Sequence, residues 1–175
     1  MAEKSIAWAI TGAGHALEEC VEVILKQEKV DVFFSRAAEE VLRIYKLYDR
    51  LNTPKTRIRR ETQASSPLVG RLFGGAYSTL VVAPATSNSV AKFVHGISDT
   101  LVTNLFAQSG KARVPAIVYP TDLSPEVDSV GPNGESIKVY PREIDLGNTE
   151  KLRTFSGVRV VSNREELEQC LAACL

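Results

Sequence analysis

The sequence predicts one α/β domain with a mostly parallel sheet, extending over residues 1–175. Short apolar runs alternate with segments in which apolar residues recur at helical spacing. No internal repeat or low-complexity segment divides the chain, and 175 residues suit one domain better than two. Strands that alternate with helices form βαβ units with right-handed crossovers, so we expect the strands to lie parallel.

The first half of the chain supplies two strand–helix pairs. Ser5 to Thr11 is an apolar run that stops at the Gly12-Ala13-Gly14 turn, and helical spacing follows from Ala16 to Leu25. Val30 to Phe34 is a second apolar run. Ser35 then stands where a hydroxyl caps the helix that begins RAAEEVLRIY.

The second half begins with Ser78 to Ala83, whose apolar and β-branched residues indicate a strand covered on both faces. A turn is expected at Pro84 to Asn88. One helix is predicted from Val90 to about Gly96 and another from Asp99 to Ser109. Val114 to Tyr119 is the next predicted strand, closed by Pro120.

Two polar stretches and the tail complete the chain. Asn52 to Ser66 is predicted to be a solvated loop, with a gate over a ligand or a contact between subunits as the alternative. Thr121 to Tyr140 carries several turn signals and predicts a long excursion or a hairpin. The tail predicts a helix over Thr149–Phe155, a strand over Val158–Val161 and a helix from Asn163 to Leu171.

Composition excludes several functions. Lysine plus arginine balance aspartate plus glutamate at 21 each, so no net field draws nucleic acid or an anionic membrane. No apolar run reaches the roughly 18 residues of a membrane span, and no leader is expected before the first strand. Three cysteines without a C-x-x-C pair and two histidines without partners at ligand spacing predict no metal site. We therefore expect a cytoplasmic protein.

The predicted strand ends indicate where a ligand binds. In open parallel sheets, ligands lie beyond the carboxyl ends of the strands. Those ends are Thr11 to Gly14, Ser35, Pro84 to Asn88, and Tyr119 to Asp122, and most of their residues are small or hydroxylic. The Gly12-x-Gly14 turn lacks the rest of a dinucleotide fingerprint, because Leu17 and Ser35 stand where a small and an acidic residue belong. A site for a phosphate or another electron-rich group remains.

The segment from Pro84 to Leu101, PATSNSVAKFVHGISDTL, resembles the P-A-S-A-N-T-x-A-K…G-x-x-D-x-L signature of the homo-oligomeric flavin-containing cysteine decarboxylase family. Thr86 replaces a serine and Ser87 an alanine of that pattern. The opening ITGAG and the SRAAEEV segment also agree with the family. The resemblance covers roughly residues 5 to 120.

This resemblance implies a flavodoxin-like (Rossmann-like) three-layer fold with FMN held where subunits meet, in homo-oligomers built from trimers. By position, the Gly12–Gly14 turn and Ser35 would serve the phosphate and ribityl chain, and Thr86–Asn88 would approach the flavin ring. The full set of implied FMN contacts is Thr11, Gly12, Ala13, Gly14, Ser35, Ala85, Thr86, Ser87, Asn88, Ser98, Thr100, Leu101 and Thr103.

Departures from the family pattern bear on activity. The decarboxylases of the family use a histidine between the second and third strands, and this chain has none between Phe34 and Ser78. Their Met-Asn substrate motif is replaced by Tyr119-Pro120-Thr121-Asp122. Decarboxylation is therefore disfavoured. No catalytic acid is identified, because Lys92 and Asp99 fit ordinary helix-surface and capping roles.

ITGAGH, SRAAEEVLRIY and AKFVHGISDTLVTN are most similar to the archaeoflavoprotein and dihydromethanopterin reductase branch. That similarity implies an FMN-dependent oxidoreductase that reduces dihydromethanopterin, a pterin, to tetrahydromethanopterin with electrons from an external donor, either ferredoxin or an NAD(P)H-linked one. Cys170 and Cys174 cannot ligate an iron–sulfur cluster by themselves. The alternatives are a ferredoxin-linked electron-transfer archaeoflavoprotein and a flavin-binding assembly subunit without turnover.

Overall fold

A computed structural model describes residues 5–61 and 66–174. The segment before the first strand, on which the expectation of no leader depends, lies outside the described residues, as does part of the predicted loop at 52–66. Within the described ranges, no helix combines the length and the hydrophobicity needed to cross a bilayer.

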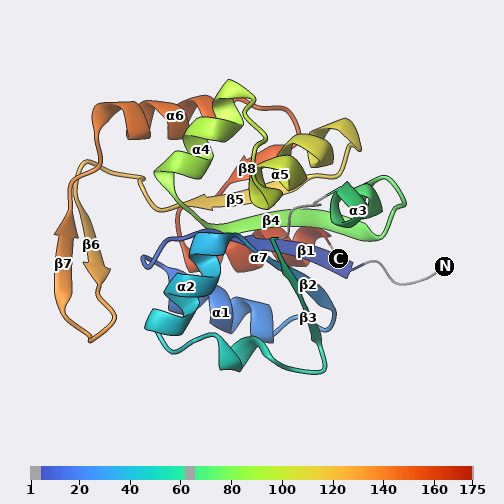
Figure 1. Cartoon of the computed structure of the whole chain (residues 1–175). Helices are drawn as coiled ribbons and strands as arrows, with labels where there is room; N and C mark the ends of the chain where they lie inside the picture. The colour runs from blue at the N-terminus through green and yellow to red at the C-terminus, as the bar shows by residue number, and fades with distance from the viewer. Residues whose placement is uncertain (1–4, 62–65, 175) are drawn as a thin grey trace.

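A six-stranded sheet forms the middle layer of the described residues (Figure 1). All its strands run parallel, in the order β3-β2-β1-β4-β5-β8. They are β1 (Ser5–Ile10), β2 (Val30–Phe34), β3 (Thr56–Arg60), β4 (Tyr77–Ala85), β5 (Ala116–Pro120) and β8 (Val158–Val160). The predicted flavodoxin-like fold is confirmed. Strand order reverses between β1 and β4, the point where sheets of this kind open a crevice for ligands.

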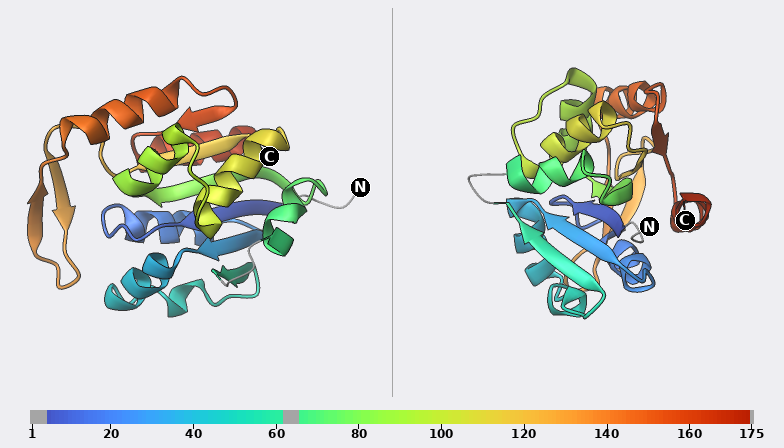
Figure 2. Two further views of the ribbon diagram at one scale, coloured as in Figure 1. Left: turned by 45° about the horizontal axis from the view of Figure 1, so that its top comes forward. Right: turned by 90° about the vertical axis from the view of Figure 1, so that its right-hand side faces the viewer.

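Helices cover both faces of the sheet, as two further views show (Figure 2). One core contains residues of α1 (Leu17–Leu25), α2 (Arg36–Ile44) and α7 (Arg164–Cys174). The other contains residues of α3 (Ser66–Val69), α4 (Ser87–His95), α5 (Leu101–Lys111) and α6 (Glu143–Arg153). Short 3-10 helices η1 (Asp49–Leu51) and η2 (Gly70–Leu72) complete the helical elements. Along β1, Trp8 packs into the first core and Ala9 into the second, because successive strand side chains point to opposite faces.

The loop predicted over Asn52–Ser66 is wrong where β3 forms. β3 pairs with β2 along its whole length, from Val30 opposite Thr56 to Phe34 opposite Arg60. It is an edge strand, so its arginines can reach solvent while the backbone bonds to one neighbour.

A buried carboxylate on β2 accompanies this arginine-rich edge. Asp31 accepts a hydrogen bond from the Tyr77 hydroxyl at 2.7 Å. The guanidinium of Arg71 lies 3.3 Å from the same carboxylate, and that of Arg59 lies 3.9 Å away. The Asp31 carboxylate on β2 therefore gives arginines of β3 and η2 an opposite charge to approach. This explains why an arginine-rich segment forms a strand beside β2.

The helix predicted over Thr149–Phe155 begins earlier, at Glu143. Asp145 causes this start, because its carboxylate accepts a hydrogen bond from the Arg142 backbone N–H at 3.1 Å and closes a capping box. The other predicted boundaries agree with the structure within a few residues, the usual precision for helix and strand ends.

The segment predicted as an excursion or a hairpin contains a hairpin. Strands β6 (Val127–Val130) and β7 (Ser136–Val139) pair antiparallel and form a separate two-stranded sheet. The hairpin stands away from the main body, on the side where β1 and β4 end (Figure 1). It therefore overhangs the edge at which the sheet is expected to bind a ligand.

Candidate functional site

Thr11 joins the two turns that meet at the strand-order reversal. Its hydroxyl donates to the Pro84 carbonyl at 2.8 Å and accepts from the Thr86 backbone N–H at 3.0 Å. The side chain is buried, so these bonds use its hydrogen-bonding capacity within the protein. Thr11 thus holds the turn after β1 against the turn after β4.

A cavity of about 390 Å³ opens beyond these strand ends, and we call it the strand-end cavity. Its lining comes from the turns after β1 and β2, the end of β3 and the starts of α4 and α5. The lining residues are Thr11, Gly12, Ser35, Arg36, Ala37, Glu61, Thr86, Asn88, Ser89, Lys92, Thr100, Val102 and Thr103.

Three helices direct their N-termini at the strand-end cavity, and each has a hydroxylic cap that lines it. Ser35 accepts from the Ala38 N–H at 3.0 Å and caps α2, while Thr86 caps α4. Thr100 caps α5 in a reciprocal pair with Thr103, with bonds of 3.2 and 2.9 Å. Helix N-termini carry partial positive charge and exposed N–H donors, so their convergence favours an anion.

An internal carboxylate already lies among these donors. Glu61 accepts from the backbone N–H of Leu101 at 2.7 Å and from that of Arg36 at 3.2 Å. Those two residues are the first of α5 and of α2. The carboxylate bridges two helix N-termini, which shows that their amides are arranged to bind one anion.

Sequence reasoning missed Glu61 because it missed β3. The Glu61 N–H donates to the Phe34 carbonyl at 3.2 Å, continuing the β2–β3 ladder by one residue. This pairing brings Glu61 beside Ser35. The alternation of Thr56 and Ile58 with arginines was the available signal for an edge strand.

Glycine at position 12 permits close packing in this region. A Cβ added there would lie 2.6 Å from the Ala37 Cβ, well inside van der Waals contact. A Cβ at Gly14 would meet the Tyr45 hydroxyl. α1 itself begins only at Leu17, so the glycine turn precedes the helix instead of forming its first turn.

A second cavity of about 380 Å³ lies between the strand-end turns and the β6–β7 hairpin, and we call it the hairpin cavity. Its lining residues are Ala13, Gly14, His15, Tyr45, Thr86, Ser87, Thr121, Asp122, Val127, Ser129, Ile137 and Val139. The two cavities share Thr86. Tyr45 ties the hairpin to the body, because its hydroxyl donates to the Val130 carbonyl at 3.2 Å.

The two cavities bring together ten of the thirteen predicted site residues. The strand-end cavity contains Thr11, Gly12, Ser35, Thr86, Asn88, Thr100 and Thr103, and the hairpin cavity contains Ala13, Gly14, Ser87 and again Thr86. Ala85, buried in β4, and Ser98, which is exposed, line neither of the two cavities. The Leu101 side chain is in the core, but its N–H reaches Glu61.

Lys92 adds a cation to the wall of the strand-end cavity. Its ammonium group contacts both carboxylate oxygens of Asp99 at 2.9 Å. Hydrogen bonding to Lys92 holds the pKa of Asp99 below its usual range. The pair joins α4 to the segment before α5.

A doubly wound parallel sheet with helix N-termini converging at its strand-order reversal defines a protein class that binds phosphate-bearing cofactors. Within that class the chain belongs to the Flavoprotein family, whose model matches residues 1–174.

Several proteins resemble this chain more closely than the family model alone shows. An uncharacterised protein of Methanocaldococcus jannaschii is 39% identical over 95% of this chain and 93% of its own length. A dihydromethanopterin reductase (acceptor) of the same organism is 45% identical over 67% of this chain, but the match spans only 53% of that reductase. The crystal structure of Burkholderia xenovorans DmrB in complex with FMN, described as a cubic protein cage for redox transfer, has a TM-score of 0.87. It is 40% identical and covers 98% of this chain and 95% of its own.

Solved FMN-dependent cysteine decarboxylases share the fold at lower identity. At 15% identity they bear on the fold alone. The match to the Flavoprotein family and the reductase relatives confirm the predicted membership of a flavin-binding family and its dihydromethanopterin reductase branch.

Proposed function

We propose that this chain is an FMN-dependent reductase that passes electrons from an external donor to dihydromethanopterin, giving tetrahydromethanopterin. The observation that carries the proposal is the anion position where Glu61 bridges the N-termini of α2 and α5. It lies at the crevice where a sheet of this order binds its ligand.

The residues present fit FMN. Glu61 is a carboxylate stand-in for the phosphate, since both anions accept hydrogen bonds from helix N-terminal amides. In the proposal, Ser35 and the amides of Arg36 and Leu101 hold the phosphate. The Gly12–Gly14 turn would hold the ribityl chain, and Thr86–Asn88 would contact the ring. Bound FMN supplies the redox chemistry, because a flavin takes electrons from a donor and passes them to an organic substrate.

The proposed substrate is inferred from the names of two related proteins. The M. jannaschii protein that is 45% identical and a Methanosarcina mazei protein that is 42% identical both carry the name dihydromethanopterin reductase (acceptor). The matches span 53% and 61% of the lengths of those proteins. For this reason we propose their activity for this chain and do not take it as shown. Reduction of the dihydropterin adds two electrons and two protons across one C=N bond.

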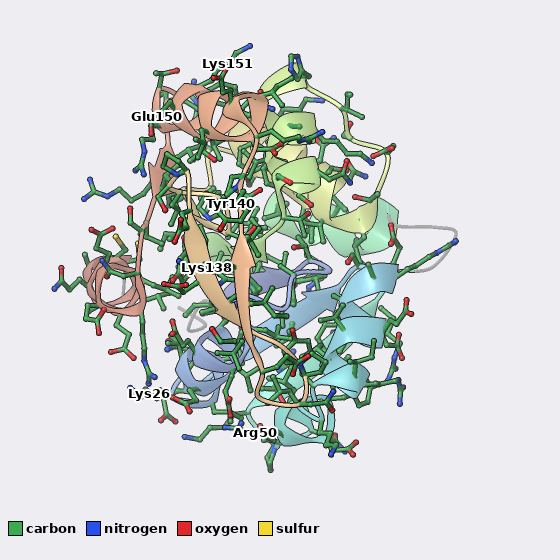
Figure 3. The ribbon with its side chains drawn as sticks, turned by 90° about the vertical axis from the view of Figure 1, so that its left-hand side faces the viewer. Lys26, Arg50, Lys138, Tyr140, Glu150 and Lys151 are labelled. Carbon is green, nitrogen blue, oxygen red and sulfur yellow. The ribbon has the colours of Figure 1, made fainter. Side chains whose placement is uncertain are left out.

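The proposal also includes an assembly of copies of this chain, built from trimers, in the cytoplasm. Large apolar side chains support an interface at the hairpin and the start of α6. Val130 is 61% exposed, Tyr140 67% and Ile144 60%. Figure 3 shows Tyr140 on this outer side of the molecule, next to β7. Large apolar side chains left exposed along one outlying segment are typical of surfaces that bind other proteins.

Anaerobic reoxidation tests the function. The FMN-loaded protein is photoreduced, and dihydromethanopterin is then added while the flavin absorption is followed. Recovery of the oxidised spectrum with formation of tetrahydromethanopterin is expected. If the spectrum stays bleached, the substrate assignment is wrong. Reduction by ferredoxin without pterin turnover would indicate an electron carrier, and a flavin that cannot be cycled would indicate an assembly subunit. Comparing ferredoxin with NAD(P)H as reductant identifies the donor.

A further inference from the structure

The hairpin cavity has two unlike walls. The hairpin contributes the apolar side chains of Val127, Ile137 and Val139, while the strand-end turns contribute mainly hydroxyl and backbone groups. A slot with an apolar wall opposite polar groups suits a flat heterocycle whose face is apolar and whose edge carries hydrogen-bonding groups. The cavity adjoins the strand-end cavity at Thr86, so a heterocycle held there would lie next to the proposed flavin.

Asp122 is the only carboxylate among the described residues that line the hairpin cavity. Its backbone is fixed from two sides. The Asp122 carbonyl accepts from the buried Thr149 hydroxyl of α6 at 3.2 Å, and the Thr121 N–H donates to the Ala85 carbonyl of β4 at 3.0 Å. Because the segment is anchored, the Asp122 side chain is held in a defined position from which it can bind a ligand.

The carboxylate keeps acceptor capacity for a ligand. The Thr121 hydroxyl contacts one carboxylate oxygen of Asp122 at 3.2 Å. An ionised carboxylate has about four acceptor positions, so this contact leaves most of them for other donors. Across the part of the chain that the structure describes, Asp122 forms no ion pair. The guanidinium of Arg142 binds Asp145 through two bonds of 2.8 Å, which raise the pKa of Arg142, and the charge of Asp122 raises it further without a hydrogen bond between the two side chains.

We propose that Asp122 is the residue of the hairpin cavity that determines specificity for a pterin. The inference rests on the proposed reductase function and adds how the substrate is recognised. A pterin presents a ring N–H and a 2-amino group side by side, two donors that match the two oxygens of a carboxylate. Charge-assisted, two-point bonding of this kind gives both affinity and orientation. The opposite edge of the pterin ring system, which carries the C=N bond to be reduced, would then face the flavin.

Two heterocycles that differ at one position test the inference. The probes are 6-methyl-7,8-dihydropterin and 6-methyl-7,8-dihydrolumazine, in which an oxo group replaces the 2-amino donor. Both have the same reducible C=N bond. The unmodified holoprotein is expected to prefer the pterin in kcat/KM, and Asp122→Asn to lose about 100-fold or more with the pterin. Sites built for a hydrogen-bonding group reject mismatched partners by such factors. Because an amide offers one donor and one acceptor, Asp122→Asn should reverse the preference toward the lumazine.

Controls separate recognition from folding and from redox chemistry. Asp128→Asn alters a carboxylate on β6 that lines the neighbouring cleft beside α1 and should leave the preference unchanged. Asp122→Glu keeps the carboxylate and should retain the pterin preference. Calorimetric titration of the oxidised holoproteins with 6-methylpterin and 6-methyllumazine should show the same reversal without turnover.

The outcomes are distinguishable. If Asp122→Asn keeps the pterin preference, or loses bound FMN, the inference is overturned, because Asp122 then plays no part in reading the substrate or serves the cofactor instead. If the unmodified reduced protein is reoxidised neither by dihydromethanopterin nor by either probe, the proposed function fails and the inference fails with it.

Discussion

The two cavities of the site are built differently. The strand-end cavity is formed by backbone N–H groups and capping hydroxyls at the ends of buried strands and helices. The hairpin cavity depends on side chains of a two-stranded sheet that stands apart from the core, linked to α2's end by the Tyr45 hydroxyl. A backbone site on core elements suits a constant group such as a phosphate. A side-chain site under an outlying hairpin suits the group that distinguishes one substrate from another.

This contrast predicts that changes in the strand-end cavity alter cofactor affinity, whereas changes to the hairpin and to the residues that hold it alter substrate use. Substitutions of Gly12, Glu61 and Tyr45 test that division.

Gly12→Ala should have the largest effect. The new Cβ would lie 2.6 Å from the Ala37 Cβ, so the turn or α2 must shift. Overpacking typically costs about 1–3 kcal/mol, which here should weaken FMN binding by about 10-fold to 100-fold. Gly70→Ala is the matched control, because a Cβ there would meet no atom within 4 Å. Equal FMN dissociation constants for the two variants, measured by flavin fluorescence, would contradict the role of the close approach.

Glu61→Gln should strengthen FMN binding by about tenfold, the equivalent of ~1.4 kcal/mol. The phosphate must displace the Glu61 carboxylate from the N–H groups of Arg36 and Leu101, and a neutral amide competes less well. The ligand-free variant should also be less stable to unfolding, by about 1 kcal/mol, since it loses charge-assisted bonds. Riboflavin, which has no phosphate, should bind both proteins alike. Weaker FMN binding by the variant would show that Glu61 remains in place beside the cofactor.

Tyr45→Phe should have the smallest effect, confined to the hairpin cavity. The variant loses the hydroxyl bond to Val130, worth about 0.5–1 kcal/mol, so KM for the pterin should rise a few-fold. FMN affinity should not change. Tyr140→Phe, at an exposed tyrosine next to the same hairpin, is the control and should leave both constants unchanged. A loss of FMN affinity in Tyr45→Phe alone would mean that the two cavities are not separate in function.

The same contrast explains what could be predicted from the sequence. Ser35 could be found because helix caps and strand-end turns are local patterns, whereas Thr100 was expected only from the family resemblance. Both line the strand-end cavity. Glu61 could not, because its position depends on a charged edge strand that pairs with β2. The hairpin was expected only as one of two options. Its link to the body joins Tyr45 and Val130, 85 residues apart, a contact that no local pattern encodes.

Binding of FMN and riboflavin to the ligand-free protein tests the central claim most directly. The account predicts saturable binding of one FMN per chain and riboflavin binding at least about tenfold weaker. The phosphate takes over from Glu61 the amides of Arg36 and Leu101 and gains the hydroxyl of Ser35, a charge-assisted bond worth about 1.5–3 kcal/mol. Equal affinities for the two flavins, or no binding of either, would contradict a phosphate site at the N-termini of α2 and α5.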